Sequence, residues 1–242
     1  MVKKREPELV TASNAVRARK PSQERSRTRF QALLDATAKL LETRDFTDVG
    51  LYDISQLAGV PAASVYHFFP TKEAAFVALA QRYFEAQGKI LREPTEEQGV
   101  NGWGEHLRTR YLRAVHFYNE NPAFSRIMFS GTVSADVRRI DLEFVSVSEH
   151  SPHYWLARYY VMPYLPDAEL RFATLVGIYD GVWAASYARY GKITEDYSRE
   201  GIRAGIAYCR TFLPEVLPLR SPDQAVVEAP LPSAPGRLTQ SR

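Results

Sequence analysis

The sequence predicts an all-α protein: a small amino-terminal domain of three helices, with a helix-turn-helix, joined by a fourth helix to a larger helical domain. Three observations support this. Apolar residues recur at the i, i+3, i+4 spacing of an amphipathic helix. A glycine separates two short helical segments between residues 50 and 72. Two consecutive segments near the carboxy-terminal end carry rows of small residues at four-residue spacing.

Two longer helices flank the short segments of the small domain. The first is expected from about Ser22 to Thr43, and the fourth from about Thr71 to Arg92. The packing stripe of the first helix comprises Phe30, Leu33, Leu34, Thr37, Ala38 and Leu41. Thr71 is a good N-cap for the fourth helix, whose length lets it leave the small domain and reach the next.

Residues 50–72, GLYDISQLAGVPAASVYHFFPTK, predict two short helices joined by a tight turn. The first ends at Gly59, a residue suited to the left-handed conformation that closes a helix. Pro61 can open the second, because a missing N–H costs nothing there. Two short helices with a glycine-containing turn form a helix-turn-helix, whose second helix enters the major groove of DNA. We interpret Ile54, Leu57, Val60 and Phe69 as core residues of this domain.

The motif resembles the TetR family of bacterial one-component regulators, whose signature is roughly I-A-x-x-A-G-V-S-x-x-x-x-Y-x-x-F-x-x-K. The matching residues here are Ile54-Ser55, Ala58-Gly59-Val60-Pro61, Tyr66, Phe69 and Lys72. The resemblance is detailed over about residues 26–92 and architectural beyond. The chain departs from the pattern at Gly50 and Pro61, where the family often has Thr and Ser. Those two residues cap helices and can bind phosphate, so we expect this chain to hold DNA partly through other groups.

The second helix of the motif is expected to contact DNA with small side chains. Ala62, Ala63 and Ser64 favour close approach and contact with thymine methyl groups. Tyr66 suits a phosphate contact, the alternative being a core aromatic; His67 could contact a base edge, phosphate or only solvent. Lys72 follows an N-cap, so it is expected at phosphate rather than merely solvated. The predicted DNA-binding residues are Arg25, Arg27, Arg29, Gly50, Pro61, Ala62, Ala63, Ser64, Tyr66, His67, Thr71 and Lys72.

The charge of the chain is concentrated at its amino-terminal end. Residues 1–29 contain nine Lys or Arg and three Glu, net +6, whereas the whole chain has a net charge of +3, so the remainder carries −3. A basic arm before a helix-turn-helix can follow phosphates or enter a minor groove. For residues 1–20 the alternative is a disordered, solubilising tail.

Composition sets limits on class and compartment. The chain has 242 residues and 45% hydrophobic content, enough for a substantial core. Its single cysteine, Cys209, excludes an internal disulfide and suits the cytoplasm. Without a leader or a stretch of eighteen apolar residues, we expect neither secretion nor a membrane span. The predicted regions are a basic flexible arm (1–21), a DNA-binding domain (22–93), an effector-binding and dimerisation domain (94–213) and a Pro-rich disordered tail (214–242).

The larger domain is expected to be helical throughout, with least definition in its middle. The expected helices span Trp103 to Asn119, Pro122 to Phe129, Ser134 to about Leu142, His153 to about Tyr164, Asp167 to Tyr190, and Thr194 to Phe212. Phe144 to Ser148 alternates apolar and polar residues, which argues against a helix there. A break is expected near Ser146 to Pro152.

The last two helices carry the rows of small residues, comprising Ala173, Gly177, Gly181 and Ala185, and then Gly201, Gly205 and Cys209. Glycine inside a helix costs about 1 kcal/mol relative to alanine, so packing should compensate. Packing inside one chain explains one row. Two rows favour a four-helix interface between two chains, which is also where TetR-like proteins dimerise. A homodimer suits a two-fold, palindromic operator.

Aromatic residues with interspersed polar groups predict a small-molecule site in the larger domain. The resemblance implies that an inducer bound there moves the DNA-binding domains apart. The candidate pocket residues are Trp103, His106, Arg110, Tyr111, Phe124, Met128, Tyr159, Tyr179 and Trp183. His150 and His153 have a metal-like spacing, but Pro152 lies between them, and we expect neither a metal nor a cofactor.

The sequence is compatible with three functional classes. The favoured one is a ligand-responsive transcriptional regulator, a repressor released from a palindromic operator by a small, largely apolar or aromatic effector. The alternative is a DNA-binding regulator or DNA-organising protein without such an effector. The third, an enzyme with an ancillary DNA-binding domain, is disfavoured because the sequence lacks a nucleophile elbow, a phosphate-binding glycine loop and a His-Glu zinc motif.

Overall fold

The computed structural model describes residues 18, 19, 21, 23–93, 102–130, 135–146 and 151–221. It confirms the predicted all-α class. The elements are α1 (Glu24–Thr43), the 3-10 turn η2 (Phe46–Asp48), α2 (Leu51–Ala58), α3 (Ala62–Phe68), α4 (Lys72–Arg92), α5 (Gly102–Glu120), α6 (Pro122–Phe129), α7 (Ala135–Ser146), α8 (Pro152–Tyr159), α9 (Ala168–Tyr190) and α10 (Glu195–Cys209). None of the helices in these ranges is both long and apolar enough to cross a membrane.

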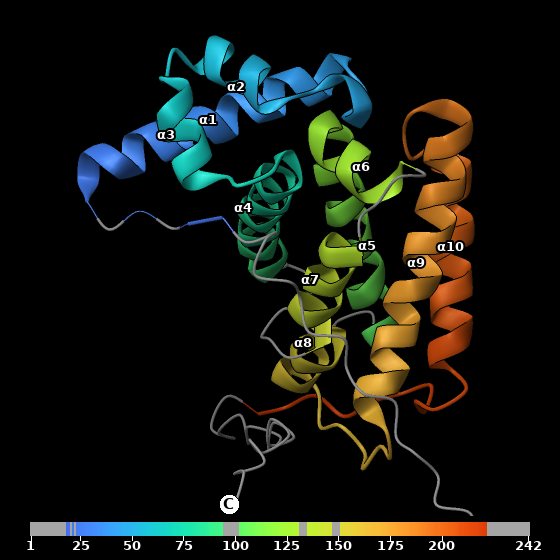
Figure 1. Cartoon of the computed structure of the whole chain (residues 1–242). Coiled ribbons are helices and arrows are strands. Elements are labelled where there is room, and N and C mark those ends of the chain that lie inside the picture. The colour runs from blue at the N-terminus through green and yellow to red at the C-terminus, as the bar shows by residue number, and fades with distance from the viewer. Residues whose placement is uncertain are drawn as a thin grey trace, which may run out of the picture.

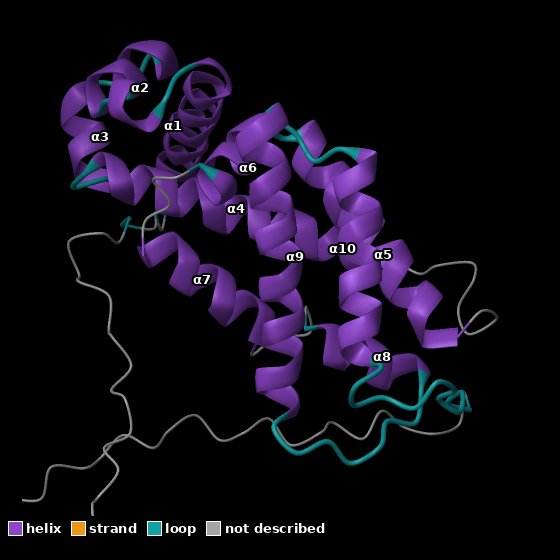
Figure 2. Cartoon of the chain, turned by 90° about the vertical axis from the view of Figure 1, so that its right-hand side faces the viewer, coloured by secondary structure: helices purple, strands orange, loops and turns teal. Residues whose placement is uncertain are grey.

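The helices form a small bundle and a larger one that share α4. Figure 1 shows α1, α2 and α3 at one end of the molecule, with α4 running from them toward the larger bundle. Helix α6 also packs against α1, so the two bundles touch at a second place. Helices α9 and α10 lie side by side along one flank (Figures 1 and 2).

An aromatic cluster and the α1 stripe form the core of the small bundle. The Phe30 ring lies 5.5 Å from that of Phe68 and 5.3 Å from that of Phe69. All six predicted stripe residues of α1 are buried. One core prediction is wrong, because Leu57 is 45% exposed. The neighbouring Ser55 points inward instead, since its hydroxyl donates to the Val60 carbonyl at 2.7 Å.

Three helices of the larger bundle end at other residues than predicted, and α10 ends at Cys209 rather than at Phe212. Helix α7 continues to Ser146, past the expected end near Leu142. Extending an existing helix adds one hydrogen bond per residue, which a short alternating stretch does not prevent. Helix α8 ends at Tyr159 rather than near Tyr164. Pro163 disfavours helical backbone just before it, and Val161 N–H donates instead to the Pro218 carbonyl at 2.8 Å.

The carboxy-terminal segment after α10 packs against the larger bundle as far as residue 221. Trp103 Nε1 donates to the Pro214 carbonyl at 2.9 Å, and Leu217 is buried. The Arg220 N–H donates to the Tyr159 carbonyl at 2.8 Å. The predicted disordered tail therefore does not begin at residue 214. Residues 222–242, and most of the predicted basic arm, lie outside the described residues.

Candidate nucleic-acid interface and effector pocket

Local hydrogen bonds fix the turn between α2 and α3. Gly59 has a φ of 61°, the left-handed conformation expected from the sequence. The Val60 N–H donates to the Ser55 carbonyl at 3.2 Å, while the Ser55 hydroxyl bonds back to Val60. Pro61 is the N-cap of α3, and its carbonyl accepts from Ser64 N–H at 2.8 Å. The angle between the two helices is thus set by the backbone.

Asp53 secures the start of α2, where Gly50 offers no capping side chain. The Gly50 N–H donates to Asp53 Oδ2 at 2.9 Å, which is one half of a capping box. Arg44 Nη1 lies 3.3 Å from the other carboxylate oxygen. The bond that a Thr side chain would accept in the family pattern is missing here, and only the reciprocal bond from the Gly50 N–H to Asp53 is formed. DNA contact at Gly50 remains a prediction.

Helix α3 presents one exposed face and one buried face. Pro61, Ala62, Ala63 and His67 are exposed, and Ser64 is half-buried. Tyr66 is 59% exposed and therefore lies outside the core. Val65 and Phe68 face inward. The leading edge of the helix therefore consists of small residues that are exposed or half-buried.

Lys72 makes a contact that the sequence did not indicate. Its Nζ donates to the Phe46 carbonyl at 2.9 Å, with the Thr47 carbonyl at 3.5 Å, so it anchors η2 to α4. Thr71 is the predicted N-cap, accepting from Ala74 N–H at 3.3 Å. A phosphate contact by Lys72 stays a prediction, and its ammonium group would have to serve both roles.

Basic residues line the start of α1. Arg25, Arg27 and Arg29 are all exposed within its first two turns. The backbone N–H of Arg19 donates to the Phe68 carbonyl at 2.9 Å, which holds this part of the arm against the end of α3. Positive charge therefore adjoins the exposed helix.

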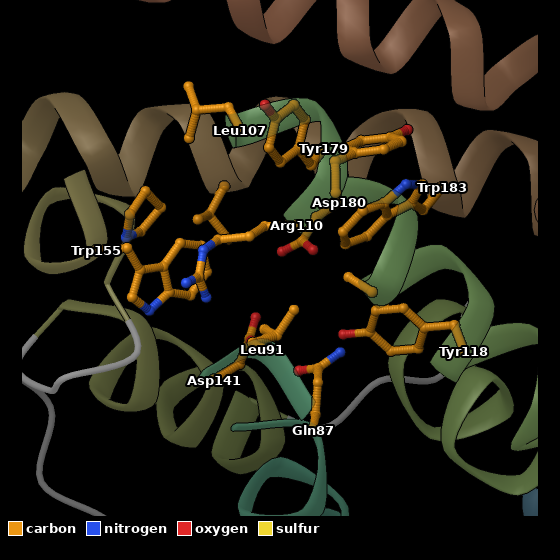
Figure 3. A pocket seen from close by; sticks show the side chains of 14 residues that line it. Gln87, Leu91, Leu107, Arg110, Tyr118, Asp141, Trp155, Tyr179, Asp180 and Trp183 are labelled. Carbon is orange, nitrogen blue, oxygen red and sulfur yellow. The ribbon is translucent and has the colours of Figure 1, made fainter. Parts of the chain in front are cut away.

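The larger bundle contains a partly open pocket, and about 620 Å³ of empty space lies in and in front of it, open solvent included (Figure 3). Helices α4, α5, α7, α8 and α9 contribute side chains to it. The lining residues are Gln87, Leu91, Leu107, Arg110, Tyr111, Ala114, Tyr118, Asp141, Pro152, Trp155, Val176, Tyr179, Asp180 and Trp183. Most of this surface is apolar or aromatic, as is usual for small-molecule sites.

Arg110 is the buried cation of this cavity. It is 3% exposed, and its guanidinium lies 4.6 Å from the centre of the Trp155 ring. Its Nε donates to His106 Nε2 at 3.0 Å, so His106 accepts as a neutral imidazole. Burial and the adjacent Arg110 lower the pKa of His106 to about 4. Burial lowers the pKa of Arg110 to about 10, which leaves it charged at neutral pH.

Two buried carboxyl groups of the cavity lining, Asp141 and Asp180, share one arginine. Arg138 Nη1 lies 3.1 Å from Asp141 Oδ2 and 2.7 Å from Asp180 Oδ2. Burial and the neighbouring Asp180 raise the pKa of Asp141 to about 8. Burial raises the pKa of Asp180 too. At neutral pH the pair therefore retains a proton, and Arg138 balances the remaining negative charge.

The carboxyl pair should make stability depend on pH. An unfolded aspartate titrates near 3.9, and in the folded chain the pKa of Asp141 is about 8. Between these values the folded state holds more protons, so the free energy of unfolding should fall as pH rises from about 4 to 8 and level off above. Asp141→Asn is expected to flatten this decline, measured by urea denaturation at pH 5 and pH 8. The control is Asp196→Asn on the exposed face of α10; an equally steep decline in Asp141→Asn would contradict the assignment.

Comparison with known proteins identifies the small bundle. The sequence model described as "Bacterial regulatory proteins, tetR family" matches residues 33–79. This span begins within α1, includes the whole helix-turn-helix and ends within α4. The small bundle is a TetR-family helix-turn-helix domain. The resemblance seen in the motif residues is thereby confirmed.

Individual relatives extend the comparison. The chain is 39% identical over 93 residues to the HTH-type transcriptional repressor NemR of Escherichia coli K12, covering 38% of this chain and 46% of NemR. It thus spans about half the length of the curated relatives it matches. A TetR-family regulator from Streptomyces coelicolor has a TM-score of 0.59 at 24% identity, over 77% of this chain and 98% of that one. RolR in complex with resorcinol has a TM-score of 0.53 at 16% identity, over 76% and 88%. These structures show a shared fold.

Some of the predicted pocket residues line the cavity. Arg110, Tyr111, Tyr179 and Trp183 line it. The other five lie outside its lining. Phe124 and Met128 are in the core, and Trp103 is hydrogen-bonded to the carboxy-terminal segment. His106 accepts a hydrogen bond from Arg110, and its ring centroid lies 4.7 Å from that of Tyr159. The lining residues missed by the sequence reasoning include Gln87, Tyr118, Asp141, Trp155 and Asp180. Asp180 had a sequence signal, since it is a charged residue between Tyr179 and Trp183 in the middle of its helix.

The two rows of small residues have different environments. On α9, Gly177, Gly181 and Ala185 are exposed, and both glycines face open space. On α10, Gly201 and Gly205 are buried. A Cβ at Gly201 would overlap the Tyr111 hydroxyl, and one at Gly205 would overlap the Tyr179 ring. The α10 glycines therefore serve packing inside the chain, which corrects their assignment to a dimer interface; Ala173 is half-buried beside the exposed α9 row.

Proposed function

We propose that this protein is a transcriptional repressor that binds a palindromic operator as a homodimer and releases it when a small, largely aromatic effector fills the cavity. The observation that carries the proposal is the position of α4. Its first turn holds η2 of the DNA-binding domain through Lys72, and its last turns place Gln87 and Leu91 in the cavity wall. Helix α4 thus contributes both to the DNA-binding domain and to the wall of the cavity.

A second contact joins the two bundles beside α4. Arg126 on α6 donates through Nη1 to the Arg44 carbonyl at 2.8 Å and lies 3.0 Å from Asp45 Oδ1. A change in the larger bundle would therefore reach the loop that follows α1 as well as α4. Effector binding shifts a population only where it favours one arrangement over the other. If the two α3 helices of a dimer moved away from a separation of roughly 34–36 Å, the dimer could no longer bind both half-sites of the operator.

Two further observations support the kind of effector and the symmetry. The cavity lining is aromatic, and RolR, which shares the fold, holds resorcinol, a small aromatic compound. The exposed small residues of α9 would let the same helix of a second chain approach closely. The alternative, a DNA-organising protein without an effector, gives no role to a cavity with a buried charge.

The experiment is selection of random DNA fragments by the full chain, followed by sequencing. A repressor of this kind selects an inverted repeat, and aromatic compounds are then screened for release of the selected fragment. Enrichment without any consensus would favour the DNA-organising alternative, and absence of DNA binding would refute both.

Ala63→Glu should abolish recognition while leaving the fold intact. Ala63 is exposed on α3, so the carboxylate is accommodated in the free protein but meets phosphates and base edges in the complex. Affinity for the selected fragment should fall by about 100-fold or more, since each half-site loses roughly what a mismatch costs. Fluorescence anisotropy measures this. The control is Tyr164→Glu, which adds the same charge at a 91% exposed position between α8 and α9, far from α3 (Figure 1). Equal affinities of the two variants would remove α3 from the interface.

A further inference from the structure

We propose that the effector cavity takes an aromatic monocarboxylate, held by a salt bridge from its carboxylate to the guanidinium of Arg110. This inference rests on the proposed function and names the chemical class of the effector.

The buried guanidinium of Arg110 is incompletely paired. Nε is engaged by His106, whereas Nη1 has no hydrogen-bond partner among the described residues. A buried charged donor without a partner costs considerable free energy. A site that keeps such a group beside an open cavity is suited to an acceptor supplied by a ligand.

The surroundings of Arg110 favour an anion. The charged groups acting on it are Arg113 and Arg158, both of its own sign, together with the Tyr159 hydroxyl, which hydrogen-bonds to it. No ion pair joins Arg110 to a carboxylate within the ranges that the structure describes. His106, in contact with it, stays neutral. The cavity therefore holds one positive charge that the protein leaves uncompensated on this wall.

The two buried carboxyl groups of the cavity do not favour a cation. Asp141 and Asp180 are paired with Arg138 and share a proton, so this triad is close to neutral at neutral pH. Figure 3 shows Arg110 beside Trp155 on one side, with Tyr118 and Trp183 across the cavity. We expect the aromatic ring of the effector to pack against these side chains, while its single carboxylate pairs with the single unpaired donor. A dianion such as a phosphate ester would need further charged donors.

The test uses three probes with the same ring system, 2-naphthoate, its neutral amide 2-naphthamide, and 2-naphthylmethylammonium. Isothermal calorimetry with the full chain at pH 7.5 should rank naphthoate first, about tenfold or more above the amide, as expected for a charge-assisted hydrogen bond. The ammonium compound should bind weakest.

Variants locate the effect. In Arg110→Met, which replaces the guanidinium with an apolar chain, naphthoate affinity should fall to that of the amide while amide affinity is kept. Arg110→Lys should retain part of the preference, which guards against a folding defect in the first variant. The control is Arg108→Met on the same helix, where Arg108 is half-exposed and paired with Glu105 at 2.7 Å.

Four results would overturn the assignment: no saturable binding of any probe, amide binding as tightly as naphthoate, tightest binding of the ammonium compound, or a naphthoate preference that survives in Arg110→Met. Failure of this inference is separable from failure of the proposed function. Sequence-specific selection of DNA by the same preparation tests the regulator, and calorimetry alone tests the anion site.

Discussion

Gly205→Leu is expected to lower the free energy of unfolding by about 3 kcal/mol or more, because an over-packed core must displace rings that have no room to move. A Cβ at this position already overlaps the Tyr179 ring, and Tyr179 is buried against Tyr111 and Trp183, with ring centroids 4.6 Å and 5.8 Å away. Domains are stable by only about 5–15 kcal/mol. Urea denaturation followed by circular dichroism measures the loss.

Comparing alanine substitutions at Gly104 and Gly205 separates the effect of steric overlap on stability from the effect of helix propensity. At Gly104 on α5, a Cβ would meet Ile206 Cδ1 at 3.9 Å, which is ordinary contact. Gly104→Ala should therefore leave stability unchanged or raise it by up to about 1 kcal/mol. Gly205→Ala should lower it despite the same gain in propensity. If both alanine variants were equally stable, the close packing of α10 on Tyr179 would be refuted.

Gly181→Leu, combined with Gly177→Leu, is expected to give a folded monomer that binds the operator about 100-fold or more weakly. Both glycines are exposed and face open space, so the larger side chains are tolerated within one chain. Between two chains they would hold the α9 helices apart. A monomer loses the gain of roughly 10²–10⁴ that comes from joining two binding sites.

Sedimentation velocity gives the oligomeric state of this double variant, and anisotropy with the selected fragment gives its affinity. The control is Lys89→Leu, which adds the same apolar side chain at an exposed position of α4. Thermal denaturation checks that all variants are folded. A double variant that still sediments as a dimer would refute the α9 interface, and the dimer would have to form elsewhere.

Short-range patterns were sufficient to predict the helix-turn-helix. Gly59 adopts the left-handed conformation for a reason local to the chain, since glycine has no Cβ to clash. Thr71 caps α4 through a bond to a residue three positions away. Leu57 failed as a core prediction because Ser55, two residues earlier, finds a hydrogen-bond partner in the turn and can face inward. That choice depends on how the turn folds, which spacing alone does not reveal.

The cavity could be predicted only in part. Arg110, Tyr111, Tyr179 and Trp183 were recognised as aromatic or polar residues of helices in the larger domain, but which of their neighbours face the same space depends on how five helices pack. Trp155 and Asp141 belong to α8 and α7, the region where the helix boundaries were least predictable. Their contribution to the site arises from contacts between residues distant in the chain.

The sequence by itself determined the helical class, the family motif and the positive charge before it, because helix periodicity, glycine turns and charge are properties of neighbouring residues. Only the tertiary structure decided what equivalent-looking residues do. The glycines of α9 face open space, whereas those of α10 lie under tyrosine rings. Arg138 is paired with two carboxyl groups, whereas Arg110 is buried with a donor unpaired. Burial and pairing are set by the helices that surround a side chain, and those neighbours are not encoded in its local pattern.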